Sequence, residues 1–589
     1  MGTPVLKKNC VIPPRPGWIV TWTALGLLMT LQVWGYAREV TEAPAPIKGV
    51  VCDADGPVVG ARVGPQGGKR RVQTDAAGRF ILKEFPRGRS VAISAWKEGY
   101  YCALIRDVKA PAEDLRFTLI PYQTDDNPHY QWIPPTGEKG CAECHNPAII
   151  EMSLSDAHLQ AARNPRFLTM YNGTDMDGNQ SPPTRYGVAN ASWKNLRVPL
   201  PPDLSKPYYG PGYVLDFPET PIDCNACHIP GASLVGTLNP NEAEGVDQFG
   251  VHCDFCHKVG GVRMDPVTHM PFPTRPGVLS MDMRRPFPDD SERFQLFFGT
   301  FDDDNVPEED TRLPLLQESR YCASCHYGVF WTTVIYNSYG EWLESPYSDP
   351  ASGKGKTCQD CHMPSPTLWK GKRITNVAPG KGGIERNPFD IHSHLTTVDE
   401  TLLKEALTMT VSVRREAGDL VVKATLYNDK TGHHVPTDSP LRHLILLVDA
   451  RDSKGARLRQ VSGPRLPAWC GKGDPARGYY AGLPGKAYAK ILKEKWTAAF
   501  PVTAYWRHTE VISDNRIGAF DKDSVSVSFL SPPSGKTVIT ATLLYRRAFK
   551  ELMDQKKWGI PDIVMAQERL VLAVDPQPSF KVPAANDSH

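Results

Sequence analysis

The chain has 589 residues, of which 41% are hydrophobic and 22% are charged, and its formal net charge is +2. This is the composition of a globular protein with a buried core, long enough for roughly three or four domains. So small a net charge gives no indication of a polyanion partner such as a nucleic acid.

The N-terminus predicts export. Three basic residues precede an apolar run from Trp18 to Trp34, and small residues suited to cleavage follow it. This order is typical of a secretory signal peptide. We therefore expect residues 1–37 to be a cleaved signal peptide or, alternatively, a membrane anchor. Either one places the chain in the periplasm, on the outer side of a membrane, or outside the cell.

Short strands separated by turn residues are predicted over residues 47–121, which indicates a small β-sandwich. The expected strands are Ile47–Cys52, Pro57–Val63, Arg71–Thr74, Arg79–Leu82, Ser90–Trp96 and Leu115–Ile120. The runs Gly56-Pro-Val-Val-Gly-Ala-Arg-Val63 and Thr74-Asp-Ala-Ala-Gly-Arg-Phe80 resemble the carboxypeptidase regulatory-like domain. The resemblance implies a domain that stabilises or binds its neighbours and carries no catalysis.

Ten of the 14 cysteines fall in five C-x-x-C-H segments within residues 128–400. The cysteines are Cys141, Cys144, Cys224, Cys227, Cys253, Cys256, Cys322, Cys325, Cys358 and Cys361, and the histidines are His145, His228, His257, His326 and His362. Two cysteines at this spacing can each bond one vinyl group of a haem, and the next residue can give its imidazole to the iron. Zinc sites and redox-active dithiols do not require a histidine at that position every time. The sequence therefore predicts five covalently bound haem c groups.

Residues 128–400 are otherwise loop-like, with short helix candidates at Ala148–Arg163 and Leu315–Tyr321. We expect a loop-rich α multihaem cytochrome c domain here, flanked by two all-β sandwich-like domains. Only 29 residues separate the first cysteines of motifs two and three, and 36 separate those of motifs four and five. This spacing predicts contact within each of these two haem pairs.

The second axial ligand of each iron decides whether a haem only carries electrons or also binds a small molecule. Histidines in or just after the haem segment are the candidates for this position. They are His158, His394, His433, His252 and His269. His392 and His434, each close to one of these, are alternatives. For any single histidine, the competing interpretation is an ordinary structural residue.

Two acidic segments have weaker interpretations. Asp175-Met-Asp177-Gly-Asn179 has the alternating oxygen ligands of part of a calcium loop, but the terminal Glu is missing. An ordinary Asx-rich turn is the alternative to a calcium site. The acidic residues of segments 302–304 and 308–310 predict a solvated face.

Strand patterns return over residues 405–575 and predict a second β-sandwich with helical insertions. The expected strands are Leu407–Val413, Leu420–Tyr427, Leu441–Ala450, Ser524–Leu530 and Lys536–Leu544, and the expected helices are Lys486–Trp496 and Phe549–Lys557. We expect residues 576–589 to be a disordered tail.

Three segments resemble multihaem cytochromes. Ser155-Asp-Ala-His158 and Asn164-Pro-Arg-Phe167 resemble the cytochrome c-552/c-554 family, in which this histidine lies on a helix and ligates a haem iron. The run Cys358-Gln-Asp-Cys-His-Met-Pro364 resembles the last haem site of many such proteins. Gly432-His-His-Val-Pro-Thr437 resembles a β-domain often fused to their C-terminus, with Asp438 in place of a glycine.

Two functions fit these features. The first is an exported electron carrier, in which closely spaced and mostly bis-His haems connect redox partner proteins such as a membrane donor and an extracellular acceptor. Membrane anchorage and self-assembly of copies are both compatible with it. The alternative is a multihaem oxidoreductase that acts on a small nitrogen or sulfur compound at one open-site haem.

Overall fold

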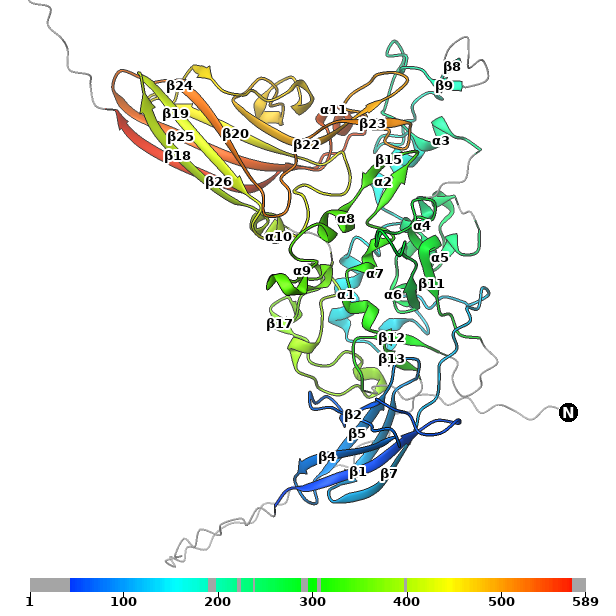
Figure 1. Cartoon of the computed structure of the whole chain (residues 1–589). Helices are drawn as coiled ribbons and strands as arrows, with labels where there is room; N and C mark the ends of the chain where they lie inside the picture. Colours follow the sequence, from blue (N-terminus) through cyan, green and yellow to red (C-terminus); the bar gives the residue numbers. More distant parts are fainter. Residues whose placement is uncertain are drawn as a thin grey trace, which may run out of the picture. The chain divides into compact units, whose positions relative to one another are not determined.

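The computed structural model describes residues 43–188, 197–219, 224–236, 239–287, 295–303, 309–396 and 400–574 (Figure 1). The predictions for residues 1–37 and for the tail at 576–589 lie outside the described residues. Of the described part, 33% lies in strands and 18% in helices. Within these ranges, no helix is both long enough and apolar enough to cross a membrane.

Two small sheets form residues 45–118. One has the order β4-β1-β7 and the other β3-β2-β5-β6. Their strands are β1 (Ala45–Cys52), β2 (Arg62–Pro65), β3 (Val72–Gln73), β4 (Arg79–Phe85), β5 (Ser90–Trp96), β6 (Ala103–Lys109) and β7 (Ala112–Thr118). Buried residues from both sheets, including Ile47, Val63, Leu82, Ile93 and Phe117, share one apolar core. Each strand predicted in this part of the sequence overlaps an observed one, and β6 is additional.

Asp302 and Asp303, which follow β12 (Phe297–Gly299), do not belong to a solvated face, and Asp304 and Glu308 of the same prediction lie outside the described residues. The carboxylate of Asp302 pairs with Arg62 of β2 at 2.9 Å and with Arg71, just before β3, at 3.0 Å. The carboxylate of Asp303, which is only 2% exposed, pairs with Arg386 at 2.9 Å. The prediction failed because the arginines that neutralise these carboxylates are far away in the sequence.

The segment that holds the five motifs contains short helices and short strand pairs. The helices are α1 (Pro147–Ser155), α2 (Pro165–Asn172), α3 (Tyr213–Asp216), α4 (Asn225–His228), α5 (Pro230–Ser233), α6 (Cys253–Cys256), α7 (Arg320–Ala323), α8 (Ser338–Leu343) and α9 (Cys358–His362). The paired strands are β8 (Tyr186–Val188) with β9 (Arg197–Pro199), β10 (Val259–Val262) with β11 (Met281–Met283), β12 with β13 (Asp310–Arg312), β14 (Gly328–Phe330) with β15 (Thr333–Tyr336), and β16 (Leu368–Trp369) with β17 (Lys372–Arg373).

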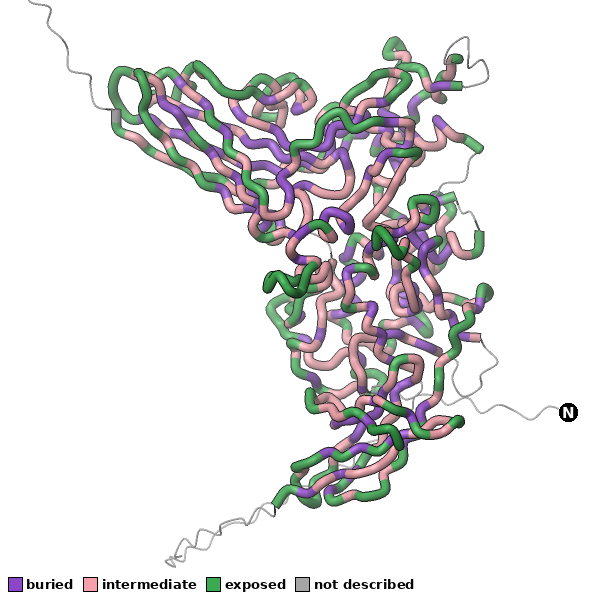
Figure 2. Tube along the Cα trace, viewed as in Figure 1, coloured by how far each residue is buried: buried purple, intermediate pink, exposed green. Residues whose placement is uncertain are grey.

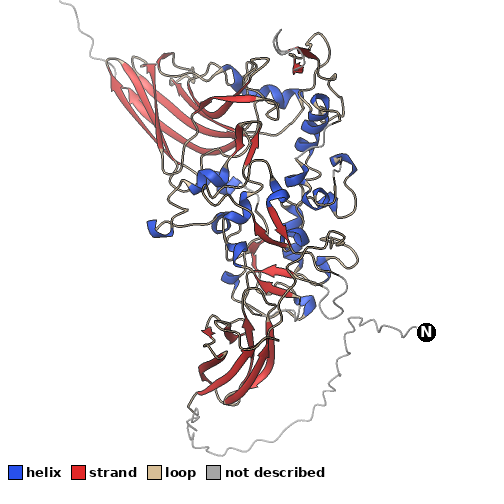
Figure 3. Cartoon of the chain, turned by 45° about the vertical axis from the view of Figure 1, so that its right-hand side comes forward, coloured by secondary structure: helices blue, strands red, loops and turns tan. Residues whose placement is uncertain are grey.

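The predicted α class of this segment is therefore wrong. Strand outweighs helix in the described chain, and none of the nine helices just named exceeds nine residues. Figure 3 shows short helices interspersed with strands and loops. The helix expected over Ala148–Arg163 ends at Ser155, because Asp156 is extended and its carboxylate accepts the amide N–H of His158. Such a side-chain bond to the backbone competes with helix continuation.

Two larger sheets form most of residues 408–574. Their orders are β18-β19-β24-β21 and β23-β22-β20-β25-β26. The strands are β18 (Thr408–Glu416), β19 (Asp419–Tyr427), β20 (His443–Arg451), β21 (Gln460–Ser462), β22 (Gly485–Glu494), β23 (Thr509–Asp514), β24 (Lys522–Leu530), β25 (Gly535–Arg546) and β26 (Ile563–Val574), and the helices are α10 (Glu400–Glu405) and α11 (Lys550–Gln555). Figure 2 shows buried stretches along these strands, which contribute to one apolar core.

The helix predicted over Lys486–Trp496 is wrong, because this segment forms strand β22. Three lysines, four and three residues apart, imitate one polar face of a helix. One of them, Lys490, is buried, and its ammonium donates to the carbonyl of Val334 at 2.6 Å. The helix predicted over Phe549–Lys557 is confirmed as α11.

Candidate metal centre

Each C-x-x-C-H motif folds as one helical turn. In motifs one to four the backbone N–H of the histidine donates to the carbonyl of the first cysteine at 2.9 to 3.1 Å, and motif five forms helix α9. Residues at i, i+3 and i+4 lie on one face of a helix. Both thiols and the imidazole of a motif therefore share one side, as attachment to a single haem requires. All ten cysteines lack a disulfide bond.

Two pairs of histidine rings have the separation expected across an iron. An imidazole–metal bond is about 2 Å long, so ring centres on opposite sides of one iron lie about 6 Å apart. His362 of motif five and His433 are 6.4 Å apart, with ring planes at 20°. His326 of motif four and His158 are 6.2 Å apart, with planes at 77°. His433 and His158 therefore fit as second ligands of the fifth and fourth motifs.

His158 and His326 each contact a carboxylate through Nδ1. The Nδ1 atom of His158 lies 2.9 Å from Oδ1 of Asp156 and 2.6 Å from the hydroxyl oxygen of Thr396, and this hydroxyl donates to the same carboxylate. The Nδ1 atom of His326 lies 3.1 Å from Oδ2 of Asp438. A proton on Nδ1 satisfies both contacts and leaves the Nε2 lone pair for a metal. His158 does not lie on a helix, contrary to the expectation from resemblance, but in the turn that Asp156 forms.

Four further histidines gather around motifs one and three. The rings of His392 and His394 are 4.5 Å apart, and His394 interacts electrostatically with both His145 and His257. Burial lowers the pKa of His145 and of His392 to about 4. These two rings are therefore neutral at pH 7, with a lone pair available for iron. The segment that ends in His394 can supply second ligands to both motifs. From the sequence, His392 is only an alternative to His394, whereas the structure places both near these motifs.

His228 of motif two has a different neighbour. Its ring stacks on Phe167 at 4.1 Å with planes only 9° apart, and within the described residues no histidine ring faces it as in the two pairs above. The tyrosines Tyr336 and Tyr505 hydrogen-bond to each other, and both interact electrostatically with Cys224 of the same motif. Motif two thus combines a single histidine with nearby phenol groups.

Two predicted ligands do not fit. The Nδ1 atom of His252 accepts the backbone N–H of Phe255 at 3.2 Å and caps α6, so the proton of this neutral ring is on Nε2. His252 packs against Trp132 and is fully buried, which is a structural role. His269 is exposed at a positive φ of 56° in the turn between β10 and β11. An imidazole on a surface turn is a poor ligand for a metal held inside the fold.

The motifs contact one another through their thiols. Thiols of different motifs lie close enough to interact electrostatically: Cys141 with Cys253, Cys227 with Cys325, Cys256 with Cys325, and Cys322 with Cys358. The thiols of motifs four and five interact, as do those of motifs two and four and those of motif three with motifs one and four. Motif four therefore lies between motifs two and five. Ala226 of motif two and Phe255 of motif three also belong to one apolar cluster. The predicted contacts between haems two and three and between haems four and five stay predictions.

The calcium site expected as an alternative does not form. The buried carboxylate of Asp175 accepts the backbone N–H groups of Asp177 and Asn179 and pairs with the ammonium of Lys557 at 2.8 Å. Lys557 also pairs with Asp177 at 2.6 Å, so a lysine provides the positive charge at this Asx-rich turn. Elsewhere in the described ranges, no group of three or more His, Cys, Asp and Glu side chains is arranged to hold a metal ion. Two protein ligands per iron suffice when a porphyrin supplies the others.

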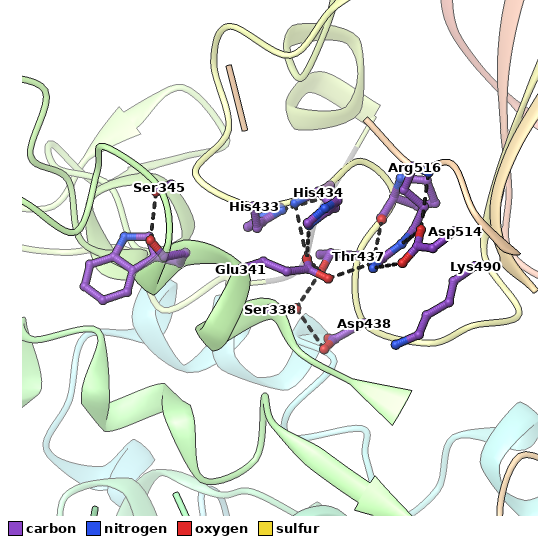
Figure 4. Close-up of polar contacts among 12 residues, drawn as sticks. Ser338, Glu341, Ser345, His433, His434, Thr437, Asp438, Lys490, Asp514 and Arg516 are labelled. Carbon is purple, nitrogen blue, oxygen red and sulfur yellow. Dashed lines mark hydrogen bonds and ion pairs between the residues drawn. The ribbon is translucent and has the colours of Figure 1, made fainter. Parts of the chain in front are cut away.

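A polar cleft of about 530 Å³ is lined in part by His434, the neighbour of His433. Several of its lining side chains are drawn in Figure 4. Its lining includes Glu341, His434 and Arg516, and Nη1 of Arg516 lies 2.8 Å from Oε1 of Glu341. Burial alone would raise the pKa of Glu341, but the hydrogen bond from His434 and the charge of Arg516 lower it to about 2. His434 thus faces Glu341, whereas the Nδ1–H group of His433 donates to the carbonyl of His434 at 2.9 Å. Of the two neighbours, His433 has the ligand geometry.

No protein-family model matches the sequence, and curated proteins give no match. Among solved structures, the penta-heme cytochrome c552 from Thermochromatium tepidum has 16% identity and a TM-score of 0.49, over 74% of this chain and 99% of that one. A cohesin–X-dockerin complex from Acetivibrio cellulolyticus has 17% identity and a TM-score of 0.12, over 13% of this chain and 58% of that one.

A PapD-like domain of human CEP192 has 7% identity and a TM-score of 0.13, over 31% of this chain and 92% of that one. At these TM-scores none of the three structures defines the fold of this chain. Its function must therefore be argued from its own motifs and histidine geometry.

Proposed function

We propose that this chain is an exported pentahaem c-type cytochrome that carries electrons between redox partner proteins. The observation that supports it is the set of five C-x-x-C-H turns, four of which have histidines placed to act as second ligands. Iron held between two histidines is low-spin and passes electrons without binding substrate. Each haem would supply a one-electron couple, and the protein would hold, orient and insulate it.

The thiol contacts indicate a route for electrons from haem to haem. Motif one pairs with motif three, motif three with motif four, motif two with motif four, and motif four with motif five. Haems attached at neighbouring motifs would lie close together, so electrons could pass through the chain in short steps. Attachment of haem to cysteine pairs takes place outside the cytoplasm, which is why export and a partner on the outer side of a membrane belong to the proposal.

Quantitative electron paramagnetic resonance of the oxidised protein tests the carrier function. We expect low-spin signals for at least four irons in five, together with reversible one-electron reduction of every haem. A protein in which most of the iron is high-spin would contradict the bis-His assignment and with it the carrier function.

A second candidate function is a multihaem oxidoreductase that acts on a small nitrogen or sulfur compound at motif two. The observation that favours it is the environment of His228, which is stacked on Phe167 and has no facing histidine among the described residues. The hydrogen-bonded phenols of Tyr336 and Tyr505, with Arg442 interacting with both, could donate to a small anionic ligand. An open haem site with polar donors is what such a reaction requires.

The same spectrum separates the two candidates. A high-spin signal from one iron in five, which disappears on addition of cyanide, supports an accessible sixth position at motif two. A signal that is entirely low-spin excludes the oxidoreductase and leaves the electron carrier.

A further inference from the structure

The axial histidines of motif four differ from the others in what holds their Nδ1 atoms. Backbone carbonyls, which carry no net charge, contact Nδ1 of His257, His392 and His433. The two rings that face each other at motif four both contact carboxylates instead, at 2.9 Å for His158 and 3.1 Å for His326. Of the two facing ring pairs, the pair at motif four is thus the one in which Nδ1 of both rings contacts a carboxylate.

Both carboxylates are shielded from water. Asp156 is 2% exposed, and the side chain of Asp438 is 19% exposed. Asp438 also accepts the hydroxyl of Ser338 at 2.8 Å, and Nη1 of Arg442 lies farther away, at 3.9 Å. At low local dielectric these charges act strongly on a neighbouring ring.

A carboxylate that accepts the Nδ1 proton makes an imidazole a more basic ligand. A more basic ligand stabilises ferric iron relative to ferrous iron, because the ferric form carries the greater positive charge. The negative charges of the buried Asp156 and the partly exposed Asp438 favour the ferric form in the same direction. Both effects lower the midpoint potential of the iron between these rings.

We propose that Asp156 and Asp438 make motif four the site of the lowest midpoint potential in the chain. The inference rests on the proposed function, since it requires haem at motif four with His158 and His326 as its ligands. Motif four lies between motifs two and five through the pairs Cys227–Cys325 and Cys322–Cys358. A low-potential site there is an uphill step, which the electron crosses on its way between these two neighbours.

Spectroelectrochemical titration of the full haem-loaded chain tests this inference. Asp156→Asn and Asp438→Asn should each raise the lowest midpoint potential of the titration, and both should raise that same step. The expected change is about tenfold in the ferric–ferrous equilibrium, or about 59 mV for a one-electron couple. The double variant should move that step further in the same direction. Asp175→Asn is the matched control, because it removes a buried carboxylate whose named partners are Lys557, Asp177 and Asn179 rather than a histidine.

Ser338→Ala gives a second test of opposite sign. It removes a donor from Asp438 without removing the charge, so the same step should move to lower potential. The inference is wrong if the aspartate variants leave the lowest step in place or move different steps, or if Asp175→Asn moves it equally. A haem count on the same samples separates these outcomes from failure of the proposed function, which would appear as a wild-type chain without five covalent haems.

Discussion

Replacing His433 by alanine should leave the iron at motif five with one axial histidine. The two rings that would hold this iron are 6.4 Å apart and nearly parallel, and His362 is the ring that remains in the variant. If motif two is the only open site of the wild type, high-spin iron accounts for one-fifth of the total. The variant should then raise this share to two-fifths. Where the wild type is fully low-spin, the expected rise is from zero to one-fifth.

The assay is integration of the high-spin signal at low temperature, normalised to total haem. His434→Ala is the matched control, because its ring faces Glu341, with Nδ1 3.4 Å from Oε2, and lines the polar cleft. This control should leave the high-spin share unchanged. An unchanged spectrum in His433→Ala, or an equal rise in His434→Ala, would refute the assignment of His433.

Three further outcomes are expected. Glu341 has a pKa of about 2 in the folded chain against an ordinary value of 4.5, so its ionised form stabilises the fold above pH 4.5, and this stabilisation is lost as the pH falls toward 2. In denaturant titrations, the difference in unfolding free energy between wild type and Glu341→Gln should therefore shrink between pH 4.5 and pH 2. A difference that stays constant over this range would contradict the prediction. Lys258 and Asp254 form an ion pair at 2.9 Å with both side chains 0% exposed. Because Lys258→Ala leaves the buried charge of Asp254 without its partner, it should lower the unfolding free energy by about 3–5 kcal/mol. A loss below about 1 kcal/mol would show that the pair is not desolvated. The near-perpendicular rings of His158 and His326 should give a strongly anisotropic low-spin signal that disappears in His158→Ala; its persistence would assign the signal to another iron.

Local patterns predicted some of the strands, but not β21, β23 and β26, nor the short strands β8 to β17. Ser90–Trp96 is observed as predicted, and the expected strand at Leu420–Tyr427 differs from β19 by one residue. The second half of β19 alternates in burial, whereas Ser90–Trp96 ends in four consecutive buried residues and was recognised as a short apolar run between turns. The strand β22 was missed because it is buried on both faces, so its lysines did not alternate with apolar residues.

The first histidine of each proposed iron site could be predicted together with its motif, whereas the second could be named only as a candidate, without the motif that it faces. A C-x-x-C-H motif carries its own geometry, because five consecutive residues close one turn. A second ligand comes from a distant segment: 168 residues separate His158 from His326, and 71 separate His362 from His433. Proximity along the chain was misleading for His252, which precedes a motif directly but caps its helix.

The carboxylates behind the motif-four ligands show the same limit. Asp156 could be suspected from the sequence, since an aspartate two residues before a histidine can form an Asx turn. The sequence indicated nothing about a role for Asp438 beyond the fact that it stands where a related pattern has glycine. Its φ of 63° is in the left-handed region that glycine favours, which fits the substitution. Its contact with His326, 112 residues away, needed the fold.

The most direct test of the central claim is the number of covalent haems on the purified chain. Intact mass under denaturing conditions, with the pyridine haemochrome spectrum of the same sample, gives this number independently of any spin state. The account predicts five haems per chain, and four after both cysteines of any one motif are replaced by serine. A mature chain with no covalent haem, or with fewer haems than motifs, would contradict it.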